Sequence, residues 1–174
     1  MAKIELKPAT DDIAIVPVVG AGHELESVRE LFLEYAQSLG FSLCFQGFDE
    51  ELASLPGDYA SPDGCLLLAM ARGTAAGCVA VRKLDAGRCE MKRLYVRPQF
   101  RAAGLGRSLA EQAIAEARRG GCRAMVLDTV PESMAAACKL YQSLGFRDCA
   151  PYYDNSCIGS RCMQKRLSAG KREK

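Results

Sequence analysis

The chain has 174 residues, and its 23 basic and 21 acidic side chains nearly cancel, leaving a formal net charge of +2 at pH 7. A chain of this length fits one domain that buries about 70% of its unfolded surface, enough for a sizeable core. The near balance of charge argues against nucleic acid and against an anionic membrane surface as partners. The basic excess lies mainly near the end of the chain, so we expect one domain over residues 1–167 and a polar, basic tail at 168–174.

The cysteines and the histidine bear on location and metal binding. The nine cysteines are odd in number, none are spaced as Cys-x-x-Cys, and several lie in apolar runs, so they are interpreted as small core residues. This usage favours a reducing, cytoplasmic location, and the single histidine, His23, gives little support for a metal site. No apolar run approaches the roughly 18 residues that span a bilayer, so we expect a soluble protein.

Apolar periodicity predicts the elements of the first half of the chain. A helix is expected where Leu25, Val28 and Leu31 recur on one face, and Gly40 ends it. Two later apolar runs flank Arg-Gly-Thr at 72–74, which has hairpin character, so their strands should be antiparallel. The full set is strands at residues 4–6 and 13–18, helices at 22–39 and 49–55, and strands at 65–71 and 77–84.

The second half alternates strands and helices. A strand at 89–96 ends before Pro98, because proline cannot extend a ladder, and a helix follows in which every fourth residue from 105 to 117 is apolar. The apolar run at 124–128 then predicts a strand parallel to 89–96, since a helix connects the two. Residues 129–132, Thr-Val-Pro-Glu, resemble a capping box that opens a helix reaching Leu144. The last expected strands are 146–153 and 160–167.

The loop at 101–108, Arg-Ala-Ala-Gly-Leu-Gly-Arg-Ser, is the most informative stretch, because it runs from a strand into a helix. A helix N-terminus leaves four backbone N–H groups unpaired and carries about half a positive charge, so it can bind phosphate. Gly104 and Gly106 allow positive φ and close backbone approach. The alternatives are a tight turn without a ligand and a dinucleotide loop, but the latter needs a third glycine that does not follow Gly106.

Two motifs in this order resemble the GNAT superfamily of N-acetyltransferases. They are Arg101-x-x-Gly104-x-Gly106 after a strand, and Leu140-Tyr141-x-x-Leu144-Gly145-Phe146 on a later helix. The resemblance implies an α/β fold with about four helices and a largely antiparallel, twisted sheet of about six to seven strands, whose central parallel pair is splayed around acetyl-CoA. It also implies direct transfer of acetyl from acetyl-CoA to a primary amine of a small molecule or peptide, in a ternary complex.

The resemblance further implies which residues bind the cofactor. Backbone groups of the strand would line the pantetheine arm, and the loop would hold the pyrophosphate. The residues so assigned are Leu94, Tyr95, Val96, Arg101, Ala102, Ala103, Gly104, Leu105, Gly106, Arg107 and Ser108, with Met134 and Ala137 on the later helix. Met134 stands where many members have asparagine, and Ala102 and Ala103 where glycine and a basic residue are common. Backbone amides of the loop are therefore expected to do most of the binding.

Tyr141 is the expected catalytic acid. In the family, a tyrosine here protonates or hydrogen-bonds the departing thiolate, and a phenol with a pKa near 10 is protonated at neutral pH. It also lies at helical spacing with Met134 and Cys138, so packing alone is the alternative interpretation.

Glu90 is the candidate base. An amine attacks a thioester only when neutral, and a lysine-like ammonium with a pKa near 10.4 must first lose a proton, usually to a carboxylate. Glu90 precedes Arg101 by 11 residues, which resembles the position of the base in histone-acetylating members. The alternative is a solvated ion pair with Lys92 on the same strand face.

Acidic and aromatic residues are candidates for the acceptor site. Asp49 and Glu50, with Tyr59 nearby, lie where the family's variable second helix borders that site, and acidic groups attract a cationic amine. Such residues also complement a helix dipole whatever the function. Tyr153, together with Tyr152, Asp154 and Asn155, is expected to form the other wall.

Three points stay open at the level of sequence. A non-catalytic acyl-CoA-binding sensor or interaction module is the alternative function, and a nucleotide-binding protein ranks third. The acceptor, the range of acyl groups and the oligomeric state, a homodimer among the options, are not read from these residues. A covalent cysteine intermediate lacks support, because His23 is the single histidine.

Overall fold

Seven strands form one sheet in the part of the chain that a computed structural model describes, residues 13–43, 47–153 and 159–167. The expected strand at 4–6, the tail at 168–174, and Asp154 and Asn155 lie outside the described residues. The strands are β1 Ile13–Pro17, β2 Gly64–Ala71, β3 Thr74–Lys83, β4 Arg88–Val96, β5 Ala124–Thr129, β6 Arg147–Asp148 and β7 Arg161–Arg166. Their order across the sheet is β1-β2-β3-β4-β5-β7-β6, and only β4 and β5 are parallel.

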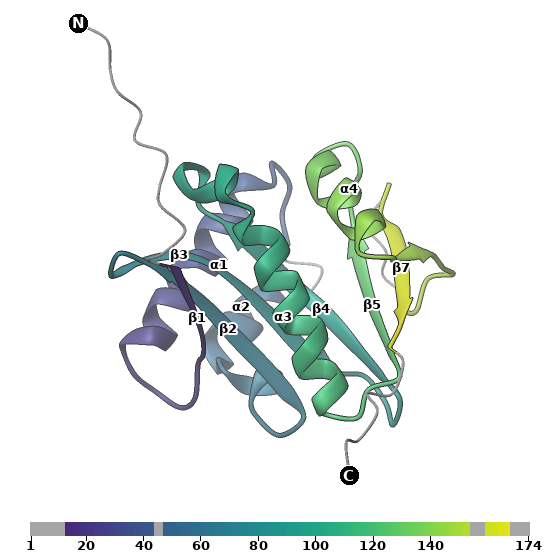
Figure 1. Cartoon of the computed structure of the whole chain (residues 1–174), viewed down its shortest axis with the longest axis horizontal. Helices are drawn as coiled ribbons and strands as arrows, with labels where there is room; N and C mark the ends of the chain where they lie inside the picture. Colours follow the sequence, from purple (N-terminus) through teal and green to yellow (C-terminus); the bar gives the residue numbers. More distant parts are fainter. Residues whose placement is uncertain (1–12, 44–46, 154–158, 168–174) are drawn as a thin grey trace, which may run out of the picture.

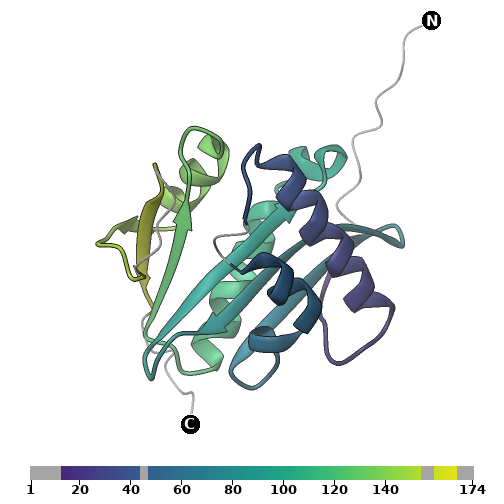
Figure 2. The ribbon, with the colours of Figure 1, turned by 180° about the vertical axis from the view of Figure 1, so that it is seen from behind.

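Helices cover both faces of this sheet. Helices α1 (His23–Ser38) and α2 (Phe48–Ser54) pack on one face, and α3 (Leu105–Arg119) packs on the other, as Figures 1 and 2 show from opposite sides. Helix α4 (Ala135–Ser143) lies on the α3 side, over β5 and β7 (Figure 1). The mixed, largely antiparallel sheet with a central parallel pair and four helices confirms the predicted fold class.

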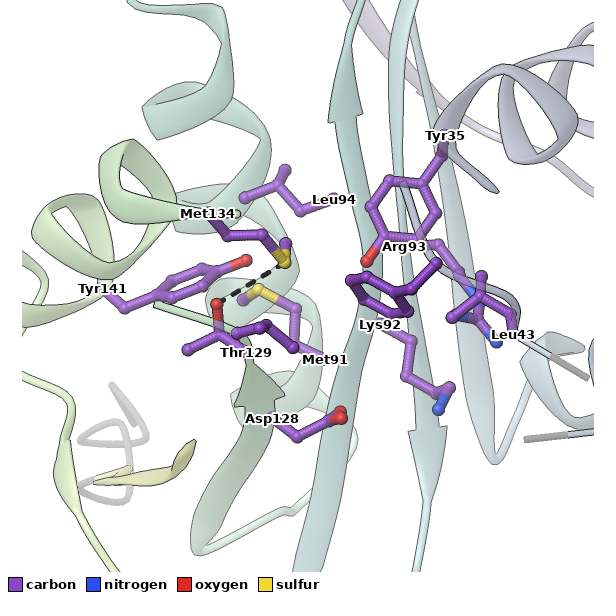
Figure 3. A pocket seen from close by; sticks show the side chains of 12 residues that line it. Tyr35, Leu43, Met91, Lys92, Arg93, Leu94, Asp128, Thr129, Met134 and Tyr141 are labelled. Carbon is purple, nitrogen blue, oxygen red and sulfur yellow. Dashed lines mark hydrogen bonds between the residues drawn. The ribbon is translucent and has the colours of Figure 1, made fainter. Parts of the chain in front are cut away.

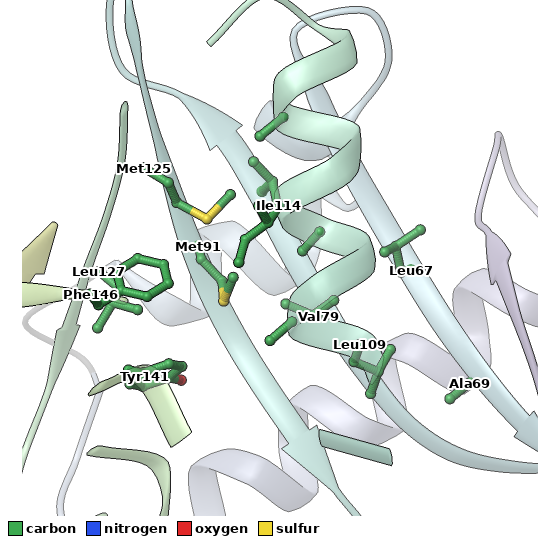
Figure 4. Packing of buried hydrophobic residues seen from close by; sticks show 14 of the residues in the cluster. Leu67, Ala69, Val79, Met91, Leu109, Ile114, Met125, Leu127, Tyr141 and Phe146 are labelled. Atoms are coloured by element: carbon green, nitrogen blue, oxygen red, sulfur yellow. The ribbon is translucent and has the colours of Figure 1, made fainter. Parts of the chain in front are cut away.

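The sheet is buried on both faces, so its central strands show little alternation. Every residue of β3 from Ala75 to Val81 is buried. The core under α3 combines residues from β2, β3, β4, β5 and β7 with the apolar stripe of that helix; Figure 4 shows members of this core, Leu67, Val79, Met91, Leu109, Ile114, Met125 and Leu127 among them. The second core, under α1 and α2, is built around Val28, Leu31, Phe32, Leu66 and Leu68.

The parallel pair separates after three residues. Strand β4 pairs with β5 from Arg88 to Glu90, and Glu90 faces Val126 at the last paired position. Beyond it the two strands diverge, which opens a V in the sheet (Figure 1). On its other side β4 stays paired with β3, but Arg93 and Leu94 together face the single residue Val79, which is a β-bulge.

Two predicted elements need correction. The capping box at 129–132 is wrong, because Thr129 is the last residue of β5 and α4 begins only at Ala135, without a side-chain cap. The Thr129 Oγ1 atom lies instead 3.7 Å from Met134 Sδ and 3.6 Å from Cys138 Sγ. The strand predicted at 146–153 is also too long, since only Arg147 and Asp148 pair with β7.

Gly77 lies on β3 where this strand packs closely against β4 and α3. A Cβ at this position would lie 2.6 Å from the carbonyl oxygen of Tyr95 and 3.2 Å from Leu109 Cδ1. Because the first of these is a backbone atom, we expect Gly77→Ala to lower the free energy of unfolding by about 1–3 kcal/mol. Urea unfolding at constant m value measures this change.

The matched control is Gly120→Ala. Gly120 has φ −71°, and a Cβ there would meet its nearest atoms at 3.6 Å, an ordinary contact. We expect its free energy of unfolding to stay within about 0.5 kcal/mol of the parent. Equal unfolding midpoints for Gly77→Ala and the parent would contradict the packing argument.

Candidate active site

A groove runs along the open edge of β4. Its β4 wall is the run Leu94 to Val96, followed by Arg101 and Gly106. Its other wall comes from the start of α4, and α1 closes it; these residues are Ser133, Met134, Ala136, Ala137 and Leu140, then Tyr35, Ser38 and Leu39. Since β5 has turned away, the backbone of Leu94 to Val96 has no strand partner on this side within the described residues, so an extended ligand can pair there.

The groove reaches the N-terminus of α3. Gly104 is the N-cap in left-handed conformation, φ 72°, and no side chain caps the helix. The first amides to bond within the helix are those of Arg107 and Ser108, both to the Gly104 carbonyl. The amides of Leu105 and Gly106 precede these bonds at the positive end of the helix dipole, which favours an anion.

The remaining loop residues lie around this helix end. Arg101 donates to the Val96 carbonyl at 2.9 Å and stacks over Tyr95. Arg107 is exposed and donates to Ser143 Oγ at 2.6 Å, whereas Leu105 is buried in the core. Ala102 and Ala103 complete the short 3₁₀ turn Pro98–Ala103 that precedes the helix.

A second hollow lies deeper in the V and shares Tyr35, Leu94 and Met134 with the groove. Its other lining residues come from β4, β5, α4 and the segment after α1, and they are Phe41, Leu43, Met91, Lys92, Arg93, Asp128, Thr129, Val130 and Tyr141. Figure 3 shows it between the two diverging strands. We call this hollow the central pocket. The groove and the central pocket are adjacent, with these three residues between them, and we refer to the two together as the cleft.

Tyr141 is part of the core under α3 and also lines the central pocket. Its ring packs edge-on against Phe146, with 5.9 Å between ring centres, and its hydroxyl points toward Met134 in the central pocket (Figure 3). Only 5% of the residue is exposed. Burial raises the pKa of Tyr141 far above its usual value, so the phenol keeps its proton at any physiological pH. The side chain therefore serves packing and also presents a proton donor.

Glu90 lies at the last position where β4 still pairs with β5, and it is not among the lining residues of the central pocket. Its side chain is 1% exposed, and its carboxylate accepts from Arg82 Nε at 2.6 Å and from the Tyr152 hydroxyl at 2.8 Å. Lys92 Nζ lies 3.6 Å away. The ion pair with Lys92 does form, but it is buried, and burial lowers the pKa of that lysine.

Asp128 is a lining residue that the sequence reasoning missed. It accepts a hydrogen bond of 2.8 Å from the hydroxyl of Tyr153, one of the residues expected in the acceptor wall. The available signal was a single acid ending an apolar strand, Ala-Met-Val-Leu-Asp, at the edge where the parallel pair opens.

The acidic cluster on α2 turns mostly to solvent. Asp49 and Glu50 are exposed and line neither hollow, whereas Glu51 faces the sheet. Tyr59 is also buried away from the cleft, and its hydroxyl donates to Glu51 Oε1 at 2.7 Å. The structure therefore brings Tyr153 into contact with Asp128, a lining residue of the central pocket, whereas Asp49, Glu50 and Tyr59 lie away from that pocket.

Glu51 holds the β4 bulge through Arg93. The guanidinium of Arg93 donates to both carboxylate oxygens of Glu51, at 2.9 and 2.7 Å, and lies over the rings of Phe48 and Tyr35. Arg93 has φ 57°, a left-handed conformation that costs about 1–2 kcal/mol for a residue other than glycine. The buried ion pair keeps this residue in place, so the backbone of Leu94 is presented to the cleft.

No helix in the described ranges is long and apolar enough to cross a membrane. Among the same residues, no group of three or more histidine, cysteine, aspartate or glutamate side chains is placed to hold a metal ion.

Known proteins resemble this chain over most of its length. A profile described as "Acetyltransferase (GNAT) family" matches residues 25–146. An uncharacterized N-acetyltransferase of Schizosaccharomyces pombe is 41% identical over 152 residues, which cover 86% of this chain and 91% of the relative.

Solved structures share the fold. An acetyltransferase from Streptococcus agalactiae aligns with a TM-score of 0.74 and 21% identity, covering 90% of this chain and 99% of the other. A Salmonella typhimurium protein, solved with its cofactor acetyl-CoA, aligns with a TM-score of 0.66 and 23% identity over 92% and 96% of the two chains.

The ion pair under the bulge predicts a large loss of stability in Glu51→Gln. The side chains of Arg93 and Glu51 are 3% and 14% exposed, so the variant leaves a buried guanidinium without its counter-charge. We expect the free energy of unfolding to fall by about 3–5 kcal/mol at pH 7. The exposed neighbour offers the control Glu50→Gln, with an expected change within about 0.5 kcal/mol.

The same pair predicts how this loss depends on pH. Burial raises the pKa of Glu51, but hydrogen bonds and charge from Arg93, with the bond from Tyr59, outweigh it and lower the pKa below its usual value. The ion pair therefore contributes its full stabilisation above the pKa of Glu51 in the unfolded chain, about 4.3. This contribution is lost as the pH falls through the lower pKa that Glu51 has in the folded protein. Urea unfolding from pH 7 downward should show the parent and Glu51→Gln converging in acid; a difference independent of pH would contradict this.

Proposed function

We propose, since the chain belongs to the acetyltransferase (GNAT) family, that it transfers the acetyl group of acetyl-CoA directly to a primary amine of a small molecule or peptide, in a ternary complex. The observation that carries the proposal is the cleft that opens where β4 and β5 separate. It joins an anion-binding helix end to a buried pocket that contains a tyrosine hydroxyl.

The cleft fits the parts of acetyl-CoA in order. The pyrophosphate would bind at the N-terminus of α3, to the backbone amides of the loop and the side chains of Arg101 and Arg107. The pantetheine arm would pair with the open edge of β4 from Leu94 to Val96, as an added strand does. Met134 and Ala137 supply the apolar wall of the groove, and the thioester then reaches the central pocket. The Salmonella typhimurium protein solved with acetyl-CoA has the same fold, which supports acetyl-CoA as the cosubstrate.

Tyr141 is proposed as the acid. As the nitrogen–carbon bond forms and the carbon–sulfur bond breaks, the phenol gives its proton to the departing sulfur and regains one from the newly bonded nitrogen. A buried phenol suits this part, because it stays neutral until the thiolate develops beside it.

The sequence predicts Glu90 as the base, and its surroundings weigh against that role. In its buried position, with Arg82, Lys92 and Tyr152 on its oxygens, it would exchange protons with an amine only through an intervening group. A cytoplasmic location also remains part of the proposal, supported by the seven described cysteines, which are all free thiols.

The role of Tyr141 predicts the behaviour of Tyr141→Phe. The variant should keep its affinity for acetyl-CoA, because the ring still packs on Phe146, but its kcat should fall about 10²–10⁴-fold with the loss of the acid. A screen of primary amines that follows release of free CoA thiol finds an acceptor, and calorimetric titration with CoA checks binding. An unchanged kcat would remove the assignment.

The position of Gly104 predicts that Gly104→Glu abolishes acetyl-CoA binding. Gly104 has φ +72° with open space around it, and a carboxylate there would oppose the pyrophosphate. Gly121→Glu is the matched control, since Gly121 has φ +83° and equal space but lies beyond the other end of α3. Both variants carry the same backbone strain and the same charge.

Calorimetric titration with acetyl-CoA separates the two variants. Binding should be undetectable in Gly104→Glu and within about twofold of the parent in Gly121→Glu, because the ends of a 15-residue helix are about 22 Å apart. Equal binding by both variants would show that the pyrophosphate binds elsewhere. Stabilisation by acetyl-CoA without CoA release from any amine would instead favour a non-catalytic acyl-CoA-binding module.

A further inference from the structure

We infer that Asp128 binds the ammonium group of the acceptor and takes its proton, and that Tyr153 is a positioning residue that orients the Asp128 carboxylate. This inference rests on the proposed function, for which it names the acceptor-binding group.

The first observation is the place of Asp128 in the V. It lies on β5 two residues beyond Val126, the last residue paired with β4, so its carboxylate is at the level where the strands have separated. Figure 3 shows that carboxylate pointing from β5 into the space toward β4. Asp128 lines the same pocket as Tyr141 and Leu94, so an amine bound to it would lie beside the thioester that the cleft can accommodate.

The second observation is how the carboxylate is held. The Tyr153 hydroxyl donates to Asp128 Oδ2 at 2.8 Å, and the ladder places Asp128 opposite Cys162 of β7. A phenol is a neutral donor, so it orients the carboxylate without cancelling its charge. Tyr153 in turn packs edge-on against Tyr152, with ring centres 5.0 Å apart.

The contrast with Glu90 is the third observation. Glu90 stands at the last paired position, opposite Val126, and has 1% of its side chain exposed. Two cations, Arg82 and Lys92, already lie on its oxygens. An ammonium group in the central pocket therefore meets Asp128 at the wall, whereas Glu90, which already has two cations on its oxygens, is not a lining residue.

Several ionisable groups surround Asp128. Lys92 of β4, Tyr35 of α1, Tyr141 of α4 and Cys162 of β7 lie near enough to interact electrostatically with it, and so do Tyr152 and Tyr153 of the segment before β7. Burial raises the pKa of Tyr35 to about 12 and those of the other three tyrosines further, so the phenols are neutral near pH 7. Lys92 is the neighbouring cation, and burial lowers its pKa.

The step balances as a proton transfer followed by acyl transfer. The ammonium group gives one proton to Asp128, and the freed nitrogen lone pair forms the bond to the thioester carbon. The carbon–sulfur bond breaks, Tyr141 protonates the sulfur, and the nitrogen returns a proton to Tyr141. The products are a neutral amide and CoA thiol, and Asp128 releases its proton to solvent.

Two nucleophiles test the role of Asp128. Ethylamine is protonated at pH 7 and needs a base, whereas hydroxylamine is already largely neutral. We expect Asp128→Asn to lose about 10²–10⁴-fold in kcat/KM with ethylamine but less than tenfold with hydroxylamine. With ethylamine, its kcat/KM should rise tenfold per pH unit, because only the neutral fraction of the amine reacts. Titration with acetyl-CoA should give the affinity of the parent, which shows that the variant is folded.

Glu90→Gln is the matched carboxylate-to-amide control, and it should change the two rates by the same factor. Tyr153→Phe should lose about tenfold with ethylamine and little with hydroxylamine, as a positioning residue would. Selective loss of ethylamine transfer in Glu90→Gln but not in Asp128→Asn would overturn the inference alone. A parent protein that releases no CoA with either nucleophile, or with a panel of larger amines, would overturn the proposed function and the inference with it.

Discussion

The end of pairing between β4 and β5 is the constraint on which the rest of the site depends. Strand pairing stops at Glu90 and Val126, and each backbone group beyond that point needs another partner. A ligand is one such partner. Strand β4 bends away from β5, and the bulge at Arg93 and Leu94 produces this bend. The bulge places the backbone of Arg93 in the left-handed conformation, which is unfavourable for a residue other than glycine. The bidentate bond to Glu51 offsets that cost from outside the cleft.

The elements that build this frame follow from local sequence. Strands β3 and β5 and helix α3 were predictable because each is an apolar run or stripe, and both faces of the sheet are covered. The end of β4 was predictable because Pro98 follows it. The start of α4 was not. Residues 129–132 satisfy a capping pattern locally, yet Thr129 stays in β5 because it pairs with Arg161 of β7, a partner far away in sequence. Tertiary pairing outweighs a cap worth about 1 kcal/mol.

The cofactor side and the acceptor side of the candidate site also differ in how far the sequence predicts them. Much of the cofactor side comes from the contiguous run of residues 94–108, so those residues could be predicted together. The acceptor side is assembled from pairs distant in sequence, such as Tyr153 with Asp128 and Arg93 with Glu51. Of three consecutive acids on α2, helical geometry turns only Glu51 to the sheet, and choosing it requires knowledge of the arginine that it meets. That arginine inside a buried strand was the available hint.

Two adjacent tyrosines donate hydrogen bonds to two carboxylates that lie in different environments. Tyr152 reaches Glu90, where the strands are still paired and two cations surround the acid. Tyr153 reaches Asp128, beyond the point of separation and on the pocket wall. Environment, more than residue type, decides which carboxylate meets an acceptor. The pairing of β7 with β5 contributes to this arrangement, because it places Asp128 opposite Cys162, although no residue of β7 lines the central pocket.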